Sequence, residues 1–266
     1  MKSSNDNAVT TAARLELILQ DVLLEGNVLV DDLADKLNVS SATIRRDLTY
    51  LEQQGLLRRT HGGAAAIEHR LYEPFRHVST FSEQEQQRAA EKRRIGLAAA
   101  DLITNGETVA FGAGTTTTQA ARSIRHRSNI TVLTNAVNIA MELSHRSDIK
   151  VCVVGGELSG SWFALVGATA QQNAGEMFLD KAFIGVDGVH SEHGLTTFYP
   201  DQASIHRTLL KQAKQKIVVA DHSKLGVAAT ARIHQAEGID ILITDKKATE
   251  SAIQPFKEKG IKVILA

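Results

Sequence analysis

The stretch Asn38-Val39-Ser40-Ser41-Ala42-Thr43-Ile44-Arg45-Arg46-Asp47-Leu48 has the pattern of a helix start followed by an amphipathic helix. Ser40 is a good N-cap, because its hydroxyl can accept a hydrogen bond from a backbone N–H that the first helical turn leaves unpaired. Ile44, Leu48 and Leu51 recur at i, i+4 and i+7 and therefore form one buried stripe. Side chains of the types on the opposite face read base edges and contact phosphates in DNA grooves. That face carries Ala42, Arg46, Thr49 and Gln53, with Arg45 at its edge.

The segments around this helix complete the pattern of a helix-turn-helix with a wing. Upstream, the amphipathic run Leu15–Leu23 predicts a first helix that ends at Gly26, where left-handed geometry is usual. A second short helix is expected at residues 31–37, and a turn of two or three residues joins it to the Ser40 helix. The run Leu56–Ala64 passes from apolar to basic residues and then to Gly-Gly, which indicates a hairpin. Any one of these helices could serve for core packing alone, but their order favours a winged helix-turn-helix.

The residues expected to contact DNA lie on the Ser40 helix and in the hairpin. The chain has 30 Lys plus Arg and 30 Asp plus Glu, so no overall basic charge points to nucleic acid. Groove contacts need only a local field, which the arginines of these two segments would supply. The candidate DNA-binding residues are Ser40, Ser41, Ala42, Thr43, Arg45, Arg46, Thr49, Arg58, Arg59, His61 and Gly62.

Length and composition limit the class of protein. The 266 residues suffice for two domains, and 43% hydrophobic with 23% charged residues is typical of a soluble globular protein. The single cysteine, Cys152, excludes an internal disulfide, favours the cytoplasm and is more typical of a buried core residue than of a nucleophile. The sequence contains no signal segment, no run long enough to span a membrane, no Cys/His cluster with metal-ligand spacing and no internal repeat.

From about residue 107 the pattern changes to short apolar strands that alternate with helices. This predicts an α/β domain with a mainly parallel sheet covered on both faces and with ligands at the carboxyl ends of its strands. The expected strands are Thr108–Phe111, Ile130–Thr134, Lys150–Val154, Lys181–Val186, Lys216–Ala220, Ile239–Thr244 and Lys262–Leu265. The expected helices lie near residues 116–127, 136–145, 201–214 and 249–259. We expect a DNA-binding domain at residues 1–66, a linker at 67–92 and the α/β domain at 93–266. The charged run Glu83–Arg94 is expected to be a solvated helix start, with a helical connector between the domains as the alternative.

The segments after four of these strands are suited to binding an anion. Gly112–Thr118 follows the first strand and precedes a helix, so glycines, hydroxyls and a helix N-terminus meet there. A Gly/Thr loop alone is weak support for a phosphate site, because threonine is also a common helix cap. Thr134-Asn135 and Gly155-Gly156 end two further strands, and Lys224 follows the strand near residue 216. A lysine is usually a solvated surface cation, but this position after a strand favours an anion partner.

Two sets of motifs together resemble the DeoR family of bacterial transcriptional regulators. The first set is Val39-Ser40, Thr43-Ile44-Arg45-Arg46-Asp47-Leu48, Leu51-Glu52, Gly55, Arg59 and His61-Gly62-Gly63-Ala64. The second set is Gly114-Thr115-Thr116, Thr134-Asn135, Gly155-Gly156, Phe183-Ile184-Gly185 and Ser223-Lys224. The resemblance covers all but about ten residues at the start of the chain. It implies a winged-helix DNA-binding domain joined to an effector domain with a sugar-phosphate-isomerase-like fold, in a repressor of sugar catabolism that a phosphorylated metabolite releases.

The resemblance also implies an effector site. Thr115 to Thr117 and Lys224 would hold the phosphate of the effector, and the residues after the other strands would lie near its sugar. Two positions depart from the family pattern, because Gly112 and Gln202 stand where the family commonly has an aspartate and a glutamate. These departures leave the identity of the effector open and make isomerase chemistry less expected. The candidate effector-binding residues are Gly112, Gly114, Thr115, Thr116, Thr117, Asn135, Gly155, Gly156, Asp187, Gln202 and Lys224.

We therefore expect a DNA-binding transcriptional regulator that represses a carbohydrate-catabolism operon under the control of a phosphorylated sugar. Its expected partners are double-stranded operator DNA, the sugar phosphate and further copies of itself in a dimer or tetramer, with no membrane and no cofactor. One alternative is a sugar-phosphate isomerase-like enzyme with an appended DNA-binding domain, and another is an α/β domain that serves only for oligomerisation. We predict no catalytic residue and no metal ligand. The candidate histidines for acid–base chemistry, expected to be surface or hydrogen-bonded residues, are His190, His193, His206 and His222.

Overall fold

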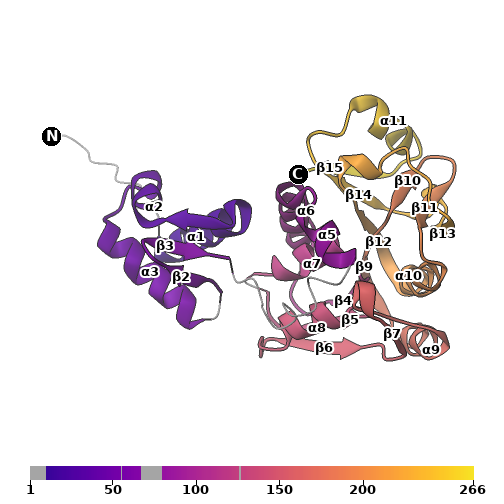
Figure 1. The fold of residues 1–266 in the computed structure, drawn as a ribbon, viewed down its shortest axis with the longest axis horizontal. Helices are drawn as coiled ribbons and strands as arrows, with labels where there is room; N and C mark the ends of the chain where they lie inside the picture. The colour runs from indigo at the N-terminus through magenta and orange to yellow at the C-terminus, as the bar shows by residue number, and fades with distance from the viewer. Residues whose placement is uncertain (1–9, 55, 67–79, 126) are drawn as a thin grey trace. The chain divides into compact units, whose positions relative to one another are not determined.

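The computed structural model describes residues 10–54, 56–66, 80–125 and 127–266 (Figure 1). The chain divides into two compact units, Met1–His69 and Arg70–Ala266, and each is described by itself. Within the described residues, no helix is both long and apolar enough to cross a lipid bilayer.

The first unit is a three-helix domain with a small antiparallel sheet. Its helices are α1 (Thr11–Glu25), α2 (Val30–Leu37) and α3 (Ser41–Gln53), and its strands are β1 (Asn27–Leu29), β2 (Arg58–Thr60) and β3 (Gly63–Ala65). The strand order is β1-β3-β2, so β2 and β3 form the predicted wing hairpin and β1 extends it. This confirms the winged helix-turn-helix. Strand β1 was not predicted, because three residues between two helices carry no periodic signal of their own.

The helix boundaries follow from local chemistry. Gly26 closes α1 with a φ of 78°, a left-handed conformation that glycine adopts without strain. The Ser40 hydroxyl caps α3 by accepting a hydrogen bond from the Thr43 N–H at 3.2 Å. The apolar stripe of α3 is fully buried against α1 and α2. The core of this unit contains Ile18, Leu19, Val22, Val28, Val30, Leu33, Ala34, Leu37, Ile44, Leu48, Leu51, Leu57 and Ala64.

The second unit is an α/β domain built on a sheet of seven parallel strands. The sheet strands are β4 (Thr108–Phe111), β5 (Ile130–Thr134), β6 (Ile149–Val153), β9 (Leu179–Gly185), β12 (Ala213–Val219), β14 (Ile241–Thr244) and β15 (Lys262–Leu265). The helices are α5 (Thr80–Gln86), α6 (Ala89–Asp101), α7 (Thr115–Arg122), α8 (Val137–Leu143), α9 (Ala168–Gly175), α10 (Pro200–Gln212) and α11 (Glu250–Glu258). All seven predicted strands are present, and every neighbouring pair is parallel. The predicted mainly parallel α/β fold is confirmed.

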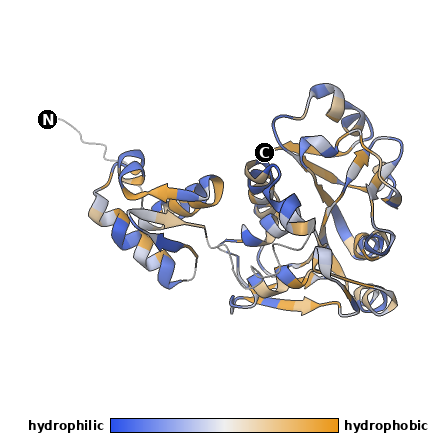
Figure 2. Cartoon of the chain, in the orientation of Figure 1, coloured by the Kyte–Doolittle hydropathy of each residue, from blue (hydrophilic) through white to orange (hydrophobic). Residues whose placement is uncertain are grey.

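The order of the strands determines where a ligand can bind. The order is β15-β14-β12-β9-β4-β5-β6, so the chain leaves β4 toward one edge and returns at β9 to build toward the other. Such a reversal opens a crevice at the carboxyl ends of the two central strands. Helices α6 and α7 cover one face of the sheet and α10 covers the other (Figure 1). The apolar colouring of the strands in Figure 2 agrees with burial on both faces.

The structure adds small elements that the sequence did not predict. A hairpin of β7 (Glu157–Ser159) and β8 (Ala164–Val166) encloses the short 3-10 helix η2 (Gly160–Trp162). A second antiparallel sheet has the order β10 (Gly188–His190), β11 (Gly194–Thr197) and β13 (Ala231–His234). Two further 3-10 helices are η3 (His222–Lys224) and η4 (Ala236–Gly238). These strands have three or four residues and do not alternate with helices along the chain, which is the pattern that identified the equally short β4 and β15.

The segment expected to be a linker is partly built into the second unit. Residues 80–86 form α5 and residues 89–92 begin α6, and the Phe81 side chain is fully buried in the α/β core. The expectation of a solvated helix start is wrong at Glu91 and Lys92, which are 6% and 4% exposed. The remainder of the expected linker, residues 67–79, lies outside the described residues.

Cys152 is only half-buried, because β6 is an edge strand of the sheet.

Candidate DNA-binding surface and anion pocket

Helix α3 presents a polar surface suited to a DNA groove. Ala42, Arg45, Arg46 and Thr49 are exposed on it, as the helical periodicity predicts. The side chain of Asp47 points inward instead, where it accepts hydrogen bonds from Arg14 Nε at 2.6 Å and Arg14 Nη2 at 3.3 Å. This ion pair ties α3 to α1, so the first unit holds the orientation of the exposed face with a charge-assisted contact.

The residues at the start of α3 have partners within the unit. The Ser40 and Thr43 hydroxyls lie 2.9 Å apart, and the Ser41 hydroxyl donates to Asp31 Oδ1 of α2 at 3.0 Å. These contacts fix the turn between α2 and α3. The three hydroxyls therefore set the position of the helix start, whether or not they also reach DNA.

Arg59 connects the wing to α3. Its guanidinium donates to the Gly63 carbonyl at 3.2 Å, the Arg45 carbonyl at 3.2 Å and Thr49 Oγ1 at 3.1 Å. Its backbone N–H donates to Glu52 Oε1 at 2.8 Å. Arg59 is thus a positioning residue in this structure, although the sequence suggested a direct DNA contact. Of the hairpin candidates, Arg58, His61 and Gly62 are exposed.

The Gly-Gly pair of the wing is required by its geometry. Gly62 has a φ of 90°, which L side chains rarely adopt. A Cβ on Gly63 would lie 1.9 Å from the Val28 carbonyl oxygen of β1. Gly62 therefore makes the turn possible, and Gly63 allows β3 to approach β1.

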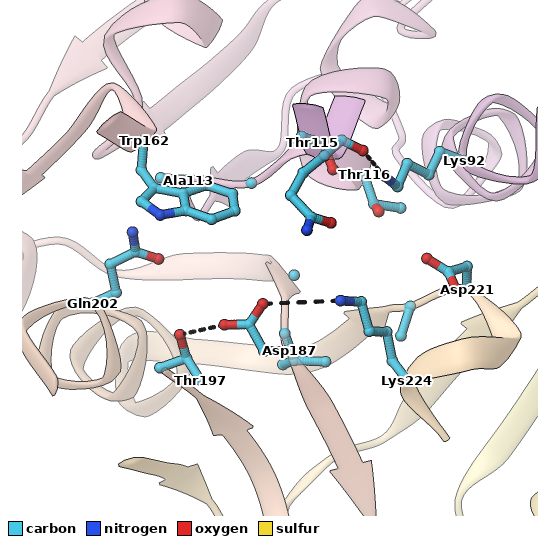
Figure 3. Close-up of a pocket in the computed structure, with 15 residues that line it drawn as sticks. Lys92, Ala113, Thr115, Thr116, Trp162, Asp187, Thr197, Gln202, Asp221 and Lys224 are labelled. Atoms are coloured by element: carbon cyan, nitrogen blue, oxygen red, sulfur yellow. Dashed lines mark hydrogen bonds and ion pairs between the residues drawn. The ribbon is translucent and has the colours of Figure 1, made fainter. Parts of the chain in front are cut away.

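The second unit contains a pocket at the reversal point of its sheet (Figure 3). Its walls come from the segments after β4, β9 and β12, which the parallel topology brings to one edge, and from α5, α6, η2, β11 and α10. The lining residues are Gln84, Lys92, Ala113, Gly114, Thr115, Thr116, Trp162, Gly185, Val186, Asp187, Thr197, Gln202, Ala220, Asp221 and Lys224.

One end of the pocket is cationic. Lys92 of α6 and Lys224 of η3 enter it from opposite sides, and the N-terminus of α7 with Thr115 and Thr116 lies beside Lys92 (Figure 3). Lys92 Nζ donates to the Gln84 carbonyl, and Lys224 Nζ lies 3.9 Å from Asp187 Oδ1. Two ammonium groups, two hydroxyls and a helix N-terminus form a surface that favours an anion.

Burial changes the proton affinity of Lys92. Desolvation lowers its pKa from 10.5 to about 8, while the nearby Asp221 carboxylate opposes this change and Lys224 adds to it. Asp221 itself is 2% exposed and accepts hydrogen bonds from the Ser223 N–H and hydroxyl at 3.0 and 2.5 Å. Lys92 thus remains protonated near neutral pH, in a place where an anionic ligand would compensate its charge.

The other end of the pocket is built from Trp162, Gln202, Asp187 and Thr197 (Figure 3). Asp187 Oδ2 accepts hydrogen bonds from the Thr197 hydroxyl at 2.8 Å and the Phe198 N–H at 3.1 Å. Trp162 packs edge-on against Tyr199 with ring centroids 5.5 Å apart. This end carries one carboxylate and no cation among the lining residues, so it differs chemically from the lysine end.

Six of the eleven candidate effector-binding residues line this pocket. They are Gly114, Thr115, Thr116, Asp187, Gln202 and Lys224. The other five are not among the lining residues. The Thr117 hydroxyl donates to the Gly112 carbonyl at 2.6 Å, and Asn135 Oδ1 accepts from the Ala113 N–H at 2.8 Å. Gly155 and Gly156 turn the chain with φ values of 71° and 103°. Thr117 and Asn135 thus shape the loop after β4 that lines the pocket, Gly155 and Gly156 turn the chain after β6, and Gly112 makes room for His206.

Gly112 leaves room for a buried histidine. A Cβ at this position would lie 2.8 Å from His206 Nε2 and 2.9 Å from Ile184 Cδ1. His206 is 1% exposed, and neither ring nitrogen has a hydrogen-bond partner among the described residues. The expectation that this histidine is at the surface or hydrogen-bonded is therefore wrong. Its desolvation lowers its pKa to about 4, against the opposing effect of Asp187, so the ring is neutral at physiological pH.

The sequence did not single out Gln84, Lys92, Trp162, Thr197 or Asp221 as pocket residues. Asp221 directly follows a predicted strand, and that position was a usable signal. The others come from helices or from short strands whose approach to the pocket is set by tertiary packing. No group of His, Cys, Asp and Glu side chains in the described part of the chain could hold a metal ion.

Both units match family models. Residues 14–70 match the DeoR-like helix-turn-helix domain, and residues 87–246 match the DeoR C terminal sensor domain. The HTH-type transcriptional repressor GlcR of Bacillus subtilis is 32% identical, over 95% of each chain. The HTH-type transcriptional regulator GlpR of Haloferax volcanii is 35% identical, over 88% of this chain and 90% of its own. The glycerol-3-phosphate regulon repressor of Escherichia coli is 29% identical, over 93% of this chain and 96% of its own.

Solved structures are more distant. The full-length sorbitol operon regulator SorC from Klebsiella pneumoniae shares 15% identity with a TM-score of 0.42, over 91% of this chain and 98% of its own. A D-ribose-5-phosphate isomerase in complex with phospho-erythronic acid shares 16% identity with a TM-score of 0.38, over 50% and 52%. Neither score supports a conclusion about function.

Proposed function

The chain belongs to the DeoR family of transcriptional regulators, and from this premise we propose that it represses a carbohydrate-catabolism operon until a phosphorylated sugar binds its second unit. The observation that carries the proposal is the cationic end of the pocket, where Lys92, Lys224 and the α7 N-terminus meet at the reversal point of the sheet. A phosphate dianion matches this set of donors and charges. We place the protein in the cytoplasm, where both operator and metabolite are found.

The DNA contacts of this proposal come from α3 and the wing. Arg45 and Arg46 would enter the major groove, and Arg58 with His61 would contact the flanking backbone. We propose a dimer or tetramer, because an oligomer with two-fold symmetry places two such helices on repeated or inverted half-sites. The sugar phosphate would bind better to the conformations that do not hold DNA and would shift the population toward them.

The test is fluorescence anisotropy of the full chain on labelled DNA from upstream of its own gene, titrated with a panel of sugar phosphates. We expect tight, sequence-selective binding that one compound weakens at least tenfold. Lys224→Ala should bind DNA normally but lose this response, whereas Lys214→Ala, an exposed lysine that pairs with Asp180, should keep it. Absence of selective DNA binding would contradict the regulator mechanism. A normal response of Lys224→Ala would contradict the position of the phosphate.

A further inference from the structure

Two buried hydrogen-bond donors lack partners at the end of the pocket away from the lysines. Trp162 and Gln202 are 8% and 6% exposed, and both side chains line the cavity. Among the described residues, neither Trp162 Nε1 nor Gln202 Nε2 has a hydrogen-bond partner. In Figure 3 the indole N–H and the amide group point toward each other across the same end of the cavity.

Unpaired donors in such a position call for an acceptor. A buried donor without a partner costs its full desolvation penalty, so native proteins keep very few of them. The indole N–H can only donate. The Gln202 amide carries two N–H donors and one carbonyl oxygen that accepts, whereas an ionised glutamate at that position would offer only acceptors. His206 also lacks partners among the described residues, but it is not one of the residues that line this pocket.

The neighbouring carboxylate indicates what kind of acceptor fits. Asp187 lies on the same side of the pocket as Gln202, between it and Lys224 (Figure 3). A second carboxylate there would be repelled by Asp187. A hydroxyl fits instead, because its oxygen can accept from the two donors while its proton is donated to Asp187. Asp187 retains acceptor capacity beyond its bonds to Thr197 and Phe198, since a carboxylate has about four lone-pair sites.

We propose that Trp162 and Gln202 form a subsite that binds a hydroxyl oxygen of the sugar moiety and so determines which sugar phosphate this regulator recognises. This inference rests on the proposed function, because it assumes that the phosphate occupies the lysine end. The two ends of the pocket then recognise different parts of the ligand. The lysine end accepts any phosphate, and the Trp162–Gln202 end selects for the sugar.

The single tryptophan of the chain allows ligand binding at this pocket to be measured directly by fluorescence. Trp162 is the one tryptophan in the 266-residue sequence, so the tryptophan emission of the full-length protein comes from this pocket alone. The probes are inorganic phosphate and a panel of hexose, pentose and triose monophosphates, each titrated by calorimetry and by Trp162 emission. We expect at least one sugar phosphate to bind ten or more times tighter than inorganic phosphate and to change the emission. Inorganic phosphate should bind without changing it.

Two variants test the subsite itself. Gln202→Glu replaces the amide donors with acceptors, and Trp162→Phe keeps an aromatic ring but removes the N–H. Each should lower the affinity for the selected sugar phosphate about five- to tenfold, as measured by calorimetry. The matched control is Gln172→Glu, the same change at an exposed position of α9, which should leave the affinity unchanged. Binding of inorganic phosphate by the two variants verifies that they are folded.

The outcomes separate the two proposals. If inorganic phosphate binds but no sugar phosphate binds tighter, or if both variants keep the advantage of the sugar phosphate, the subsite is refuted and the phosphate site stands. If neither inorganic phosphate nor any sugar phosphate binds, the phosphate site of the proposed function fails, and the subsite fails with it.

Discussion

Arg46 combines exposure with a side chain that can bind a base edge in two places. It lies on the polar face of α3, one residue from the buried Asp47 that anchors the helix to Arg14. An arginine that contacts guanine through two hydrogen bonds contributes roughly 1–3 kcal/mol to the discrimination between bases. Arg46→Ala should therefore weaken operator binding by about that amount and relax the base preference at one position. Anisotropy on operators with single base changes measures both effects.

The control for Arg46 is a basic residue away from the proposed DNA face. Lys36 of α2 is exposed and pairs with Asp21 at 2.7 Å, so Lys36→Ala removes the same unit of charge. It should change operator affinity little and leave base preference unaltered. Equal losses for the two variants would mean that Arg46 acts only through overall charge.

The lowered pKa of Lys92 predicts a pH dependence of anion binding. Phosphate monoesters are dianionic above about pH 6, so the ligand does not change charge further between pH 7 and 9. Lys92 loses its proton through about pH 8. The affinity for a phosphate monoester should therefore fall by up to about tenfold between pH 7 and pH 9, and calorimetry across this range measures it. A Lys92→Met variant should bind more weakly and show a flatter profile. The same steep profile in that variant would assign the titration to another group.

The same pKa has a consequence for stability. The pKa of Lys92 is about 8 in the folded chain and 10.5 in the unfolded chain. The unfolded state therefore binds more protons between these two pH values, so this residue makes the free energy of unfolding rise with pH across that window. At neutral pH both states hold the proton, and the cost of burying the charge is fully present. A bound phosphate would offset that cost.

At the scale of elements, Gly112 follows strand β4 and leaves space for His206 of helix α10. Its backbone has no positive φ, so only the lack of a side chain matters. Gly112→Ala would press a Cβ against His206 Nε2 and Ile184, and overpacking of this kind costs about 1–3 kcal/mol. Urea unfolding should show this loss. Combining the change with His206→Ala should recover part of it, because the clashing ring is removed.

Gly160 supplies the matched control for Gly112. An added Cβ there meets nothing within 4 Å, and its φ is not positive. Gly160→Ala should leave stability equal or raise it slightly, since alanine reduces the entropy of the unfolded chain. Equal destabilisation by the two substitutions would mean that steric contact with His206 is not the cause.

The elements that the sequence predicted are those whose pattern is local. The seven strands of the parallel sheet are continuous apolar runs, and the stripe of Ile44, Leu48 and Leu51 on α3 follows the helical period. Ser40 and Gly26 mark helix ends by their own chemistry. The small sheets of three- and four-residue strands were missed, because their hydrogen-bonding partners come from distant parts of the chain.

The same distinction applies to the pocket. Thr115, Asp187 and Lys224 follow predicted strands, so the parallel topology was enough to bring them together. Lys92 and Trp162 come from a helix before the sheet and from a 3-10 helix inside a hairpin, and their place depends on packing that has no local pattern. Gly112 carried a signal that was interpreted incompletely. The absence of a side chain there leaves room for His206, and a contact of Gly112 with the ligand stays a prediction.

At the scale of the whole molecule, the two units are linked by thermodynamics whatever their arrangement. If a sugar phosphate lowers the affinity for the operator by some factor, saturating operator must lower the affinity for that sugar phosphate by the same factor. The emission of Trp162 reports the binding of the sugar phosphate directly, since Trp162 is the one tryptophan of the sequence and lies in the pocket. Titrating the effective sugar phosphate with and without saturating operator should give dissociation constants that differ by the factor found in the anisotropy experiment. A random DNA of equal length, at a concentration below its own binding, serves as the control. If operator leaves the affinity reported by Trp162 unchanged, the compound must release DNA by binding elsewhere than at this pocket.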